Sequence, residues 1–274
     1  GPVVGRALGV HPGVDVIPFT GSTPVGKLFL QYAGASTMKQ VWLECGGKSA
    51  NLVFADAADL DQVADMVCFG IFGNSGQVCS ANSRLMVESK VKDELLDKVV
   101  QRASAIRPGD PLDPSTAMGP LVSERHAARV LSFVDQGRAS AQLVLGGAVE
   151  EGAPTGTYVP PTIFDQVPWD AAIATEEIFG PVLSVFAFSD EDEAINRANA
   201  SPYGLAASVW SDSLSRAHRV ASRLRAGTVS VNTVDALDVT TPFGGFGESG
   251  FGRDLSLHAL DKFTGLKTTW VKYA

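Results

Sequence analysis

The sequence is poor in cysteine, with only Cys45, Cys68 and Cys79 among 274 residues. An odd, sparse count without a C-x-x-C pair argues against a disulfide framework. The four histidines are scattered along the chain, so no spacing typical of a structural zinc site is present. We therefore expect a reduced, cytoplasmic protein that holds no metal.

Two other features are missing. The formal net charge is −8 and no cluster of basic residues occurs, so the electrostatic signature of a nucleic-acid-binding protein is absent. No apolar run approaches the roughly 20 residues that a membrane-spanning helix needs. Hydrophobic residues make up 45% of the chain, which is enough for the core of one large domain or two smaller ones.

Short apolar runs alternate with segments of helical periodicity, the pattern of an α/β protein with a mostly parallel sheet flanked by helices. A Pro- and Gly-rich loop over 107–123 is too long for an ordinary connection, which makes it a candidate functional loop. The pattern predicts strands over 15–21, 39–47, 51–54, 83–88, 141–147, 183–189, 205–211, 228–234 and 267–274, and helices over 23–34, 59–73, 91–106, 123–140, 190–199 and 213–227.

Cys79 has an unusual setting, GNSGQVCSANSR over 73–84. Cys68 lies in an apolar run, as buried structural cysteines usually do, whereas Cys79 is surrounded by small and polar residues. Nearby glycine permits close backbone approach, and neighbouring amides could stabilise a thiolate or an oxyanion. The local sequence leaves two alternatives open, a catalytic thiol and an idle cysteine in a polar loop.

Glu44 ends the apolar run VWLE and is followed by two glycines. A carboxylate at the C-terminal end of a strand in an α/β sheet lies where ligands bind. Desolvation there would raise its pKa toward that of a general base. The alternatives are an ion pair with Lys48 and a cap on the next element.

Three further stretches could bind a ligand. Gly21 and Ser22 separate a predicted strand from a helix N-terminus, a geometry that offers amides to a phosphate, although a simple capped turn would look the same. Glu177 and Phe179 in EEIFGPV could hold a ribose and a flat ring, or be a solvated acid beside a core aromatic. The glycine-rich stretch 241–253 could line a pocket or form an irregular loop.

Taken together, FTGST, LECGGKS, GQVC, EEIFGPV and PFGGFGESGFGR resemble the aldehyde dehydrogenase superfamily in order and spacing, over nearly the whole chain. The resemblance implies that a thiol attacks an aldehyde, NAD or NADP accepts a hydride, and a carboxylate activates water to release the acid. It implies roles for six residues: Cys79 as nucleophile, Glu44 as general base, Gly21 and Ser22 near the cofactor pyrophosphate, and Glu177 and Phe179 against the nicotinamide ribose. It also implies a homo-oligomer, either a dimer or a tetramer.

Members of this family are nearly twice as long, and the chain opens with Gly1 in what reads as the middle of a helix. We therefore expect a fragment, inactive or nearly so by itself. Its expected parts are the end of a Rossmann-like dinucleotide-binding domain (1–46), the catalytic domain (47–258) and an oligomerisation segment (259–274). The missing part also leaves the choice between NAD and NADP open.

The tail over 252–270 resembles most the branch of γ-glutamyl-γ-aminobutyraldehyde dehydrogenases, the enzymes of putrescine utilisation. Asp235 and Asp238 precede the glycine-rich stretch, and we hypothesise that they favour an amine-bearing aldehyde; two solvated loop acids are the alternative. Betaine aldehyde, a general aliphatic or aromatic aldehyde, hydrolysis of esters by Cys79 and Glu44, and a non-catalytic oligomerisation role are the other possibilities.

Overall fold

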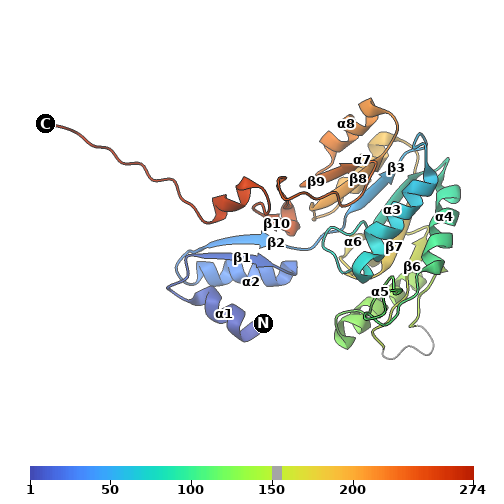
Figure 1. The fold of residues 1–274 in the computed structure, drawn as a ribbon, viewed down its shortest axis with the longest axis horizontal. Helices are drawn as coiled ribbons and strands as arrows, with labels where there is room; N and C mark the ends of the chain where they lie inside the picture. The colour runs from blue at the N-terminus through green and yellow to red at the C-terminus, as the bar shows by residue number, and fades with distance from the viewer. Residues whose placement is uncertain (150–155) are drawn as a thin grey trace.

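The computed structural model describes residues 1–149 and 156–274 of the chain (Figure 1). A small sheet and a large sheet stand side by side, and the last residues of the chain extend away from both. The described helices include none that is long and apolar enough to cross a membrane.

The small sheet has the order β1-β2-β10. β1 (Val16–Thr20) and β2 (Gln40–Glu44) are parallel, and β10 (Gly250–Phe251) pairs with β2 in the antiparallel direction. Two helices, α1 (Pro2–Val10) and α2 (Thr23–Gly34), lie beside this sheet. The small sheet therefore joins the beginning of the chain to a segment more than 200 residues later.

α2 forms as the sequence predicts. Ser22 is its N-cap residue in an extended conformation, and Pro24 lies in the first turn, where the missing N–H costs no helical hydrogen bond. The buried face of the helix, which includes Phe29 and Ala33, joins a small core with Val41 and other residues of the two parallel strands. Burial of this face, rather than side-chain capping, positions the helix.

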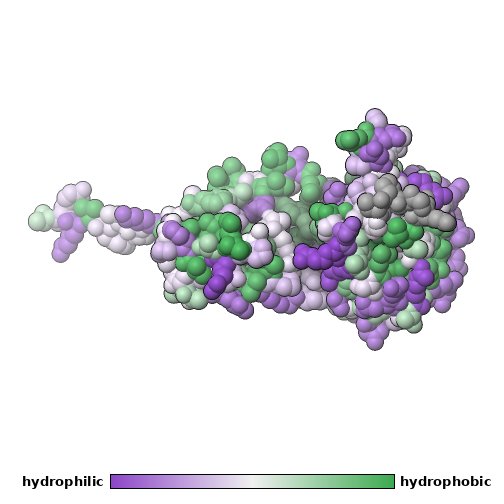
Figure 2. Space-filling model, turned by 90° about the horizontal axis from the view of Figure 1, so that it is seen from below, coloured by the Kyte–Doolittle hydropathy of each residue, from purple (hydrophilic) through white to green (hydrophobic). Residues whose placement is uncertain are grey.

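Figure 2 shows apolar side chains at the surface of the part formed by the small sheet and its helices. Val3 and Leu8 of α1 and Leu28 and Leu30 of α2 are among the exposed apolar residues there. Both helices therefore leave apolar side chains exposed to solvent in the single chain.

The large sheet has the order β5-β6-β7-β4-β3-β8-β9 and is parallel except for the β5–β6 pair at one edge. Its central strands are buried on both faces, as expected for a parallel sheet covered by helices. The strands are β3 (Ala50–Val53), β4 (Arg84–Glu88), β5 (Gln142–Leu145), β6 (Thr162–Asp165), β7 (Val182–Phe188), β8 (Ala206–Trp210) and β9 (Thr228–Val231).

Helices cover both faces of the large sheet (Figure 1). α3 (Leu60–Phe72) and α4 (Lys92–Ala105) pack on the face that includes Val53, while the helices that follow them pack on the face that includes Leu52. Neighbouring strand residues point to opposite faces, so the two cores are separate. The second face is covered by α5 (Glu124–Ser140), α6 (Ala172–Thr175), α7 (Glu191–Asn199) and α8 (Leu214–Arg223).

The predicted α/β class is confirmed, and the predicted helices match the observed ones closely. One prediction is wrong for the single chain: residues 267–274 form no strand. An extended segment becomes a strand only beside a partner strand, and these residues lie away from both sheets (Figure 1). The sequence pattern did not predict β6, α6, β10 or three short 3-10 helices, η1 (Gly73–Gly76), η2 (Gly247–Ser249) and η3 (Leu257–Lys262).

Candidate active site

One cavity brings together all six residues that the sequence singled out. Its volume is about 960 Å³, and it is bordered by the end of β1, the N-terminus of α2, the end of β2, the loop after η1 and the segment 176–179. Gly21, Ser22, Glu44, Cys79, Glu177 and Phe179 all line it. Segments that are up to about 160 residues apart in the sequence therefore meet at a single site.

Cys79 follows a tight turn with unusual backbone geometry. Asn74, Ser75 and Gly76 have φ angles of 49°, 56° and 69°, three successive residues in the left-handed region. A Cβ at Gly76 would lie 2.2 Å from the Gly180 carbonyl oxygen, so only glycine permits this approach. The turn therefore brings the backbone that leads to Cys79 against the segment that carries Phe179.

The Cys79 thiol is partly buried, whereas the other two thiols are buried. Burial raises the pKa of Cys79, the Glu44 and Glu177 charges raise it further, and the backbone N–H groups of Ser80 and Cys79 lower it. Burial raises the pKa of Cys45 to about 11 and that of Cys68 to about 12. Cys45 also lines the cavity, but backbone N–H groups lower the pKa of Cys79 and not that of Cys45.

Glu44 is the last residue of β2 and is only 6% exposed. Burial raises its pKa to about 7; Asp254 raises it as well, while Lys262 and Arg253 lower it. Neither carboxylate oxygen has a hydrogen-bond partner among the described residues, so the ion pair with Lys48 is not formed there. A buried, unpaired carboxylate with a pKa near neutrality has the properties of a general base.

The glycine-rich stretch 241–253 lies behind Glu44 and is not part of the cavity lining. A Cβ at Gly244 would lie 2.8 Å from Glu44 Oε1, and β10 pairs Gly250 with Glu44. Asp254, just after this stretch, forms an ion pair with Lys262, which is 4% exposed. These residues close off the side of Glu44 that faces away from the cavity.

The carboxylate of Glu177 lies against the glycine pair that follows Glu44. Gly47 N donates a hydrogen bond to Glu177 Oε1 at 3.1 Å, and a Cβ at Gly46 would lie 2.1 Å from Glu177 Oε2. Burial raises the pKa of Glu177, while the Gly47 N–H and the charges of Lys48 and Arg129 lower it. The solvated-acid alternative for Glu177 therefore does not describe this side chain.

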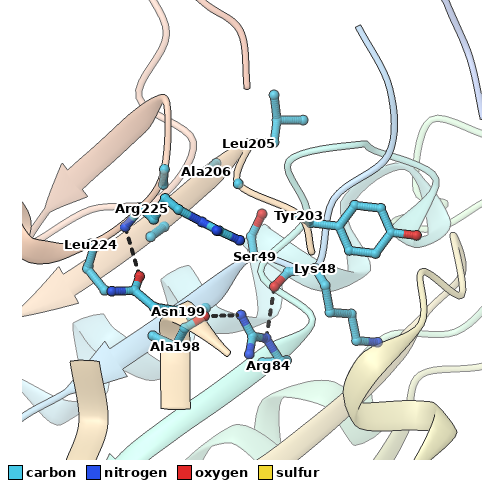
Figure 3. A pocket seen from close by; sticks show the side chains of 14 residues that line it. Lys48, Ser49, Arg84, Ala198, Asn199, Tyr203, Leu205, Ala206, Leu224 and Arg225 are labelled. Carbon is cyan, nitrogen blue, oxygen red and sulfur yellow. Dashed lines mark hydrogen bonds between the residues drawn. The ribbon is translucent and has the colours of Figure 1, made fainter. Parts of the chain in front are cut away.

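Lys48 is buried beside this carboxylate, and its Nζ has no hydrogen-bond partner among the described residues. Burial lowers the pKa of Lys48 to about 7, Arg84 lowers it, and Glu177 and Glu176 raise it. Figure 3 shows the Lys48 side chain directed away from the Arg84 guanidinium. The ammonium group therefore acts on Glu177 through space and not through a direct ion pair.

Arg84 fixes the backbone at Lys48 (Figure 3). Its Nε donates to the Lys48 carbonyl oxygen at 2.8 Å and its Nη2 to the Ala198 carbonyl oxygen at 2.9 Å, at the C-terminal end of α7. The guanidinium is almost fully buried, and burial lowers its pKa to about 10. Arg84 thus links β4, α7 and the segment that follows Glu44.

Phe179 is 37% exposed and has a φ of 58°. His126 Nε2 hydrogen-bonds the Phe179 carbonyl oxygen at 2.7 Å, and their rings are 5.9 Å apart in an edge-to-face arrangement. Arg129 Nη2 donates to the Glu177 carbonyl oxygen at 3.0 Å. Two side chains of α5 therefore hold the backbone on both sides of residue 178.

The turn before α2 directs the N-terminus of a helix at the cavity. A Cβ at Gly21 would lie 2.5 Å from the Phe19 ring, and Gly21 N donates to the Glu44 carbonyl oxygen at 3.0 Å. The Ser22 side chain accepts no hydrogen bond from the first N–H groups of α2. These N–H groups therefore face the cavity without a cap from the N-cap residue. Free N–H groups and the positive end of the helix dipole suit an anionic group.

Sequence reasoning missed several residues that line the cavity: Asn74, Gln77, His126, Arg129, Glu176 and Tyr203. His126 and Arg129 are three residues apart on one predicted helix, a spacing that places both on one face and could have marked them. Tyr203 lies in an irregular loop and carries no such signal. The described residues contain no cluster of three or more His, Cys, Asp or Glu side chains that could hold a metal ion.

Comparison with known proteins agrees with this geometry. The profile of the aldehyde dehydrogenase family matches residues 1–269. The chain is 51% identical to the NADP/NAD-dependent aldehyde dehydrogenase PuuC of Escherichia coli K12 over 271 residues, which cover 99% of this chain and 54% of PuuC. The chain thus spans about half the length of this curated relative.

Two solved structures share the fold. The indole-3-acetaldehyde dehydrogenase AldA of P. syringae, in complex with NAD+ and IAA, superimposes with a TM-score of 0.97 at 52% identity, covering 100% of this chain and 55% of AldA. The γ-glutamyl-γ-aminobutyraldehyde dehydrogenase of Burkholderia cenocepacia J2315 superimposes with a TM-score of 0.94 at 52% identity, covering 97% of this chain and 54% of that one.

Proposed function

The chain belongs to the aldehyde dehydrogenase family, and from this premise we propose that it carries the nucleophile and the base for oxidising an aldehyde to a carboxylic acid with NAD or NADP. One observation supports the proposal above all: Cys79, Glu44 and the turn before α2 border the same cavity. A thiol, a base with a pKa of about 7 and an anion-binding helix N-terminus are the parts that this reaction needs.

In the first step, the Cys79 thiolate adds to the aldehyde carbon. A C–S bond forms, and the carbonyl electron pair moves to oxygen, giving a thiohemiacetal oxyanion on Cys79. Backbone N–H groups at Cys79 are suited to hold this oxyanion. Bound NAD+ or NADP+ supplies the acceptor for the hydride that leaves the carbon, after which Cys79 carries a thioester.

In the second step, Glu44 takes a proton from water, and the water oxygen adds to the thioester carbon. The C–S bond breaks, the acid leaves and Cys79 returns as the thiolate, while Glu44 releases its proton to solvent. Gly21 and Ser22 would hold the cofactor pyrophosphate, and Glu177 and Phe179 the nicotinamide ribose, because all four line the cavity.

We propose an amine-bearing aldehyde, such as γ-glutamyl-γ-aminobutyraldehyde, as the substrate. The support is Asp235, whose Oδ1 accepts a hydrogen bond at 2.7 Å from the hydroxyl of Ser80, the residue after Cys79. Asp238 is different, because its Oδ1 already accepts bonds from the Thr240 N–H at 2.8 Å and hydroxyl at 2.6 Å. Of the two acids, Asp235 is therefore the one placed to attract an ammonium group near the nucleophile.

Asp235→Asn in the full-length protein is expected to raise KM for aminoaldehydes about tenfold, the cost of one lost charge interaction near a partly buried site. Asparagine keeps an acceptor for Ser80, so KM for aliphatic aldehydes should stay within about twofold. Steady-state kinetics with both substrate types, and with Asp238→Asn as the matched control, measure this. An equal rise in KM for both types of aldehyde would contradict the proposal.

We also propose that residues 1–274 alone bind NAD weakly and turn over little aldehyde. The support is the length of PuuC, of which the chain covers 54%, so residues outside the matched segment would complete the cofactor site. Purified residues 1–274 are expected to show less than about 1% of the full-length turnover, since cofactor orientation supplies a large part of the rate. Turnover comparable with that of the full-length protein, measured as NADH formation, would contradict this.

Several sequence predictions stay predictions. They include the division at residues 46 and 258, a homodimer or homotetramer with residues 267–274 pairing to a partner strand, and a cytoplasmic location. A purely structural role in assembly and cofactor-free ester hydrolysis are the competing functions. Selective reaction of Cys79 with iodoacetamide, against slow reaction of the two buried thiols, would favour the enzymatic reading over the structural one.

A further inference from the structure

The segment 118–129 contacts both sides of the cavity. It comprises the end of the long loop that the sequence marked and the first turns of α5. At one end it meets the turn before Cys79: the Ser75 hydroxyl donates to the Gly119 carbonyl oxygen at 2.8 Å, and the Val122 N–H donates to Gln77 Oε1 at 2.9 Å. These two bonds join the loop to the turn that sets the position of the nucleophile.

At its other end, the same segment holds the cofactor side of the cavity. His126 Nε2 bonds to the Phe179 carbonyl oxygen at 2.7 Å, and Arg129 Nη2 donates to the Glu177 carbonyl oxygen at 3.0 Å. The bond to a carbonyl oxygen requires the hydrogen on His126 Nε2. One short stretch of chain therefore supplies four hydrogen bonds to two segments that are about 100 residues apart.

The segment is itself firmly anchored. Met118 and Leu121 are 2% and 3% exposed, and Leu121 N donates to the Thr157 carbonyl oxygen at 2.9 Å. The Ser123 hydroxyl accepts from His126 N at 3.2 Å and caps α5. Buried anchors on one side and a capped helix on the other make the segment a rigid support and not a loose loop.

The turn that it supports needs such a support. Asn74 and Ser75 are held in left-handed backbone geometry, which is strained for a non-glycine residue and persists only when contacts enforce it. Ser75 is 3% exposed, and its hydroxyl is used in the bond to Gly119. The hydrogen bond therefore opposes relaxation of the turn and displacement of the residues that follow it.

We propose that the segment 118–129 is a positioning element that fixes the Cys79 turn relative to residues 177–179. Ser75, in the turn, is the main positioning residue, because its hydroxyl bonds to Gly119 of the segment. This inference rests on the proposed function for its meaning in catalysis. Its physical content, the placement of Cys79 and of the backbone N–H groups around its thiol, can be measured without any turnover.

Two variants break the support from opposite sides in the full-length protein. Ser75→Ala removes the hydroxyl, and Val122→Pro removes the N–H at a side chain that is 78% exposed. Their matched controls are Ser115→Ala, a hydroxyl in the same loop that bonds only to Asp113 in the described contacts, and Val122→Ala, which keeps the N–H. Ser75→Gly also lacks the hydroxyl, but glycine adopts the left-handed geometry without strain. An effect that remains in Ser75→Gly therefore comes from the lost hydrogen bond and not from backbone strain.

The first readout is the pH midpoint of Cys79 alkylation by iodoacetamide, followed by mass spectrometry. Loosening the turn misaligns the N–H groups of Ser80 and Cys79 that lower the thiol pKa. The midpoint is expected to rise by about 0.5 to 1 pH unit in Ser75→Ala, Ser75→Gly and Val122→Pro, equivalent to about one hydrogen bond. Both controls should keep the wild-type midpoint.

The second readout is kinetic. Turnover, kcat, should fall about tenfold in the three variants with KM for the aldehyde nearly unchanged, because misplacement affects the reacting geometry more than binding. Folded variants, checked by circular dichroism, with wild-type midpoint and kcat would overturn the proposal, and Ser75→Ala decides if Val122→Pro does not fold. A shifted midpoint in a protein without aldehyde oxidation would instead refute the proposed function and leave the positioning element standing.

Discussion

Replacement of Cys79 by alanine in the full-length protein is expected to lower kcat for aldehyde oxidation by at least about 10⁴-fold. Cys45 also lines the cavity, but burial raises its pKa to about 11, so we expect no substitute nucleophile among the described residues. Cys79→Ser should also be nearly inactive, because a hydroxyl is ionised far less than a thiol near neutral pH. NADH formation followed by absorbance measures both variants.

Cys45→Ala and Cys68→Ala are the matched controls. Both thiols are buried in apolar cores, and burial raises both pKa values. Cys45 also borders the cavity, whereas Cys68 does not, so Cys68→Ala is the more distant control. Each substitution is expected to lower thermal stability somewhat, as small core cavities do, while kcat stays within about threefold of the wild-type value. Wild-type turnover in Cys79→Ala would show that Cys79 is not the nucleophile.

Glu44→Gln is expected to have the second largest effect, and a distinct one. In the proposed reaction, addition of Cys79 and hydride transfer need no base at Glu44, whereas hydrolysis of the thioester does. We therefore expect a burst of about one equivalent of NADH per site, followed by steady turnover about 10²- to 10⁴-fold below the wild-type rate. Rapid-mixing absorbance measurements separate the burst from the steady phase.

The pH dependence follows from the raised pKa of Glu44, which is about 7. Only the ionised carboxylate accepts the proton from water. The rate of thioester hydrolysis in the wild type should therefore rise about tenfold per pH unit below pH 7 and level off above it. This rising limb should be absent from the slow steady phase of Glu44→Gln, since glutamine does not titrate.

The same raised pKa carries a consequence for stability. The folded state favours the protonated form of Glu44. Its contribution to the free energy of unfolding is therefore fully present below pH 4.5 and is lost as the pH rises through about 7.

The control for Glu44→Gln is Glu94→Gln, at an exposed glutamate of α4, which should leave both the burst and the pH profile unchanged. A full wild-type steady rate in Glu44→Gln would exclude Glu44 as the base.

Much of the fold could be predicted, because the spacing of apolar residues along the sequence indicates which face of a helix or strand is buried. Strands such as β4 and β7 are short apolar runs, and α4, α5 and α8 are amphipathic segments with clear ends. β10 was out of reach, because its two residues form a strand only through pairing with β2. β6 and α6 lie among short, irregular segments where local periodicity carries little signal.

The site was predictable to the extent that its chemistry shows in residue type. A cysteine among glycine and polar residues and a carboxylate at a strand end are visible in one sequence, and the structure brings both to one cavity. The support from His126 and Arg129 was not visible, because it depends on where α5 lies relative to residues 177–179. Sequence spacing gives the face of a helix but not what that face meets.

The pairing of β10 with β2 also sets an order of events during synthesis. Glu44 is synthesised before the residues that enclose it from behind, Gly244, Asp254 and Lys262, which follow it by about 200 residues. A chain that stops before residue 250 cannot form β10, and Glu44 then stays open to water with an ordinary acidity. The raised pKa of Glu44 therefore depends on residues that are made about 200 positions later, so we expect a chain interrupted before residue 250 to carry the Cys79 thiol beside a carboxylate of ordinary pKa.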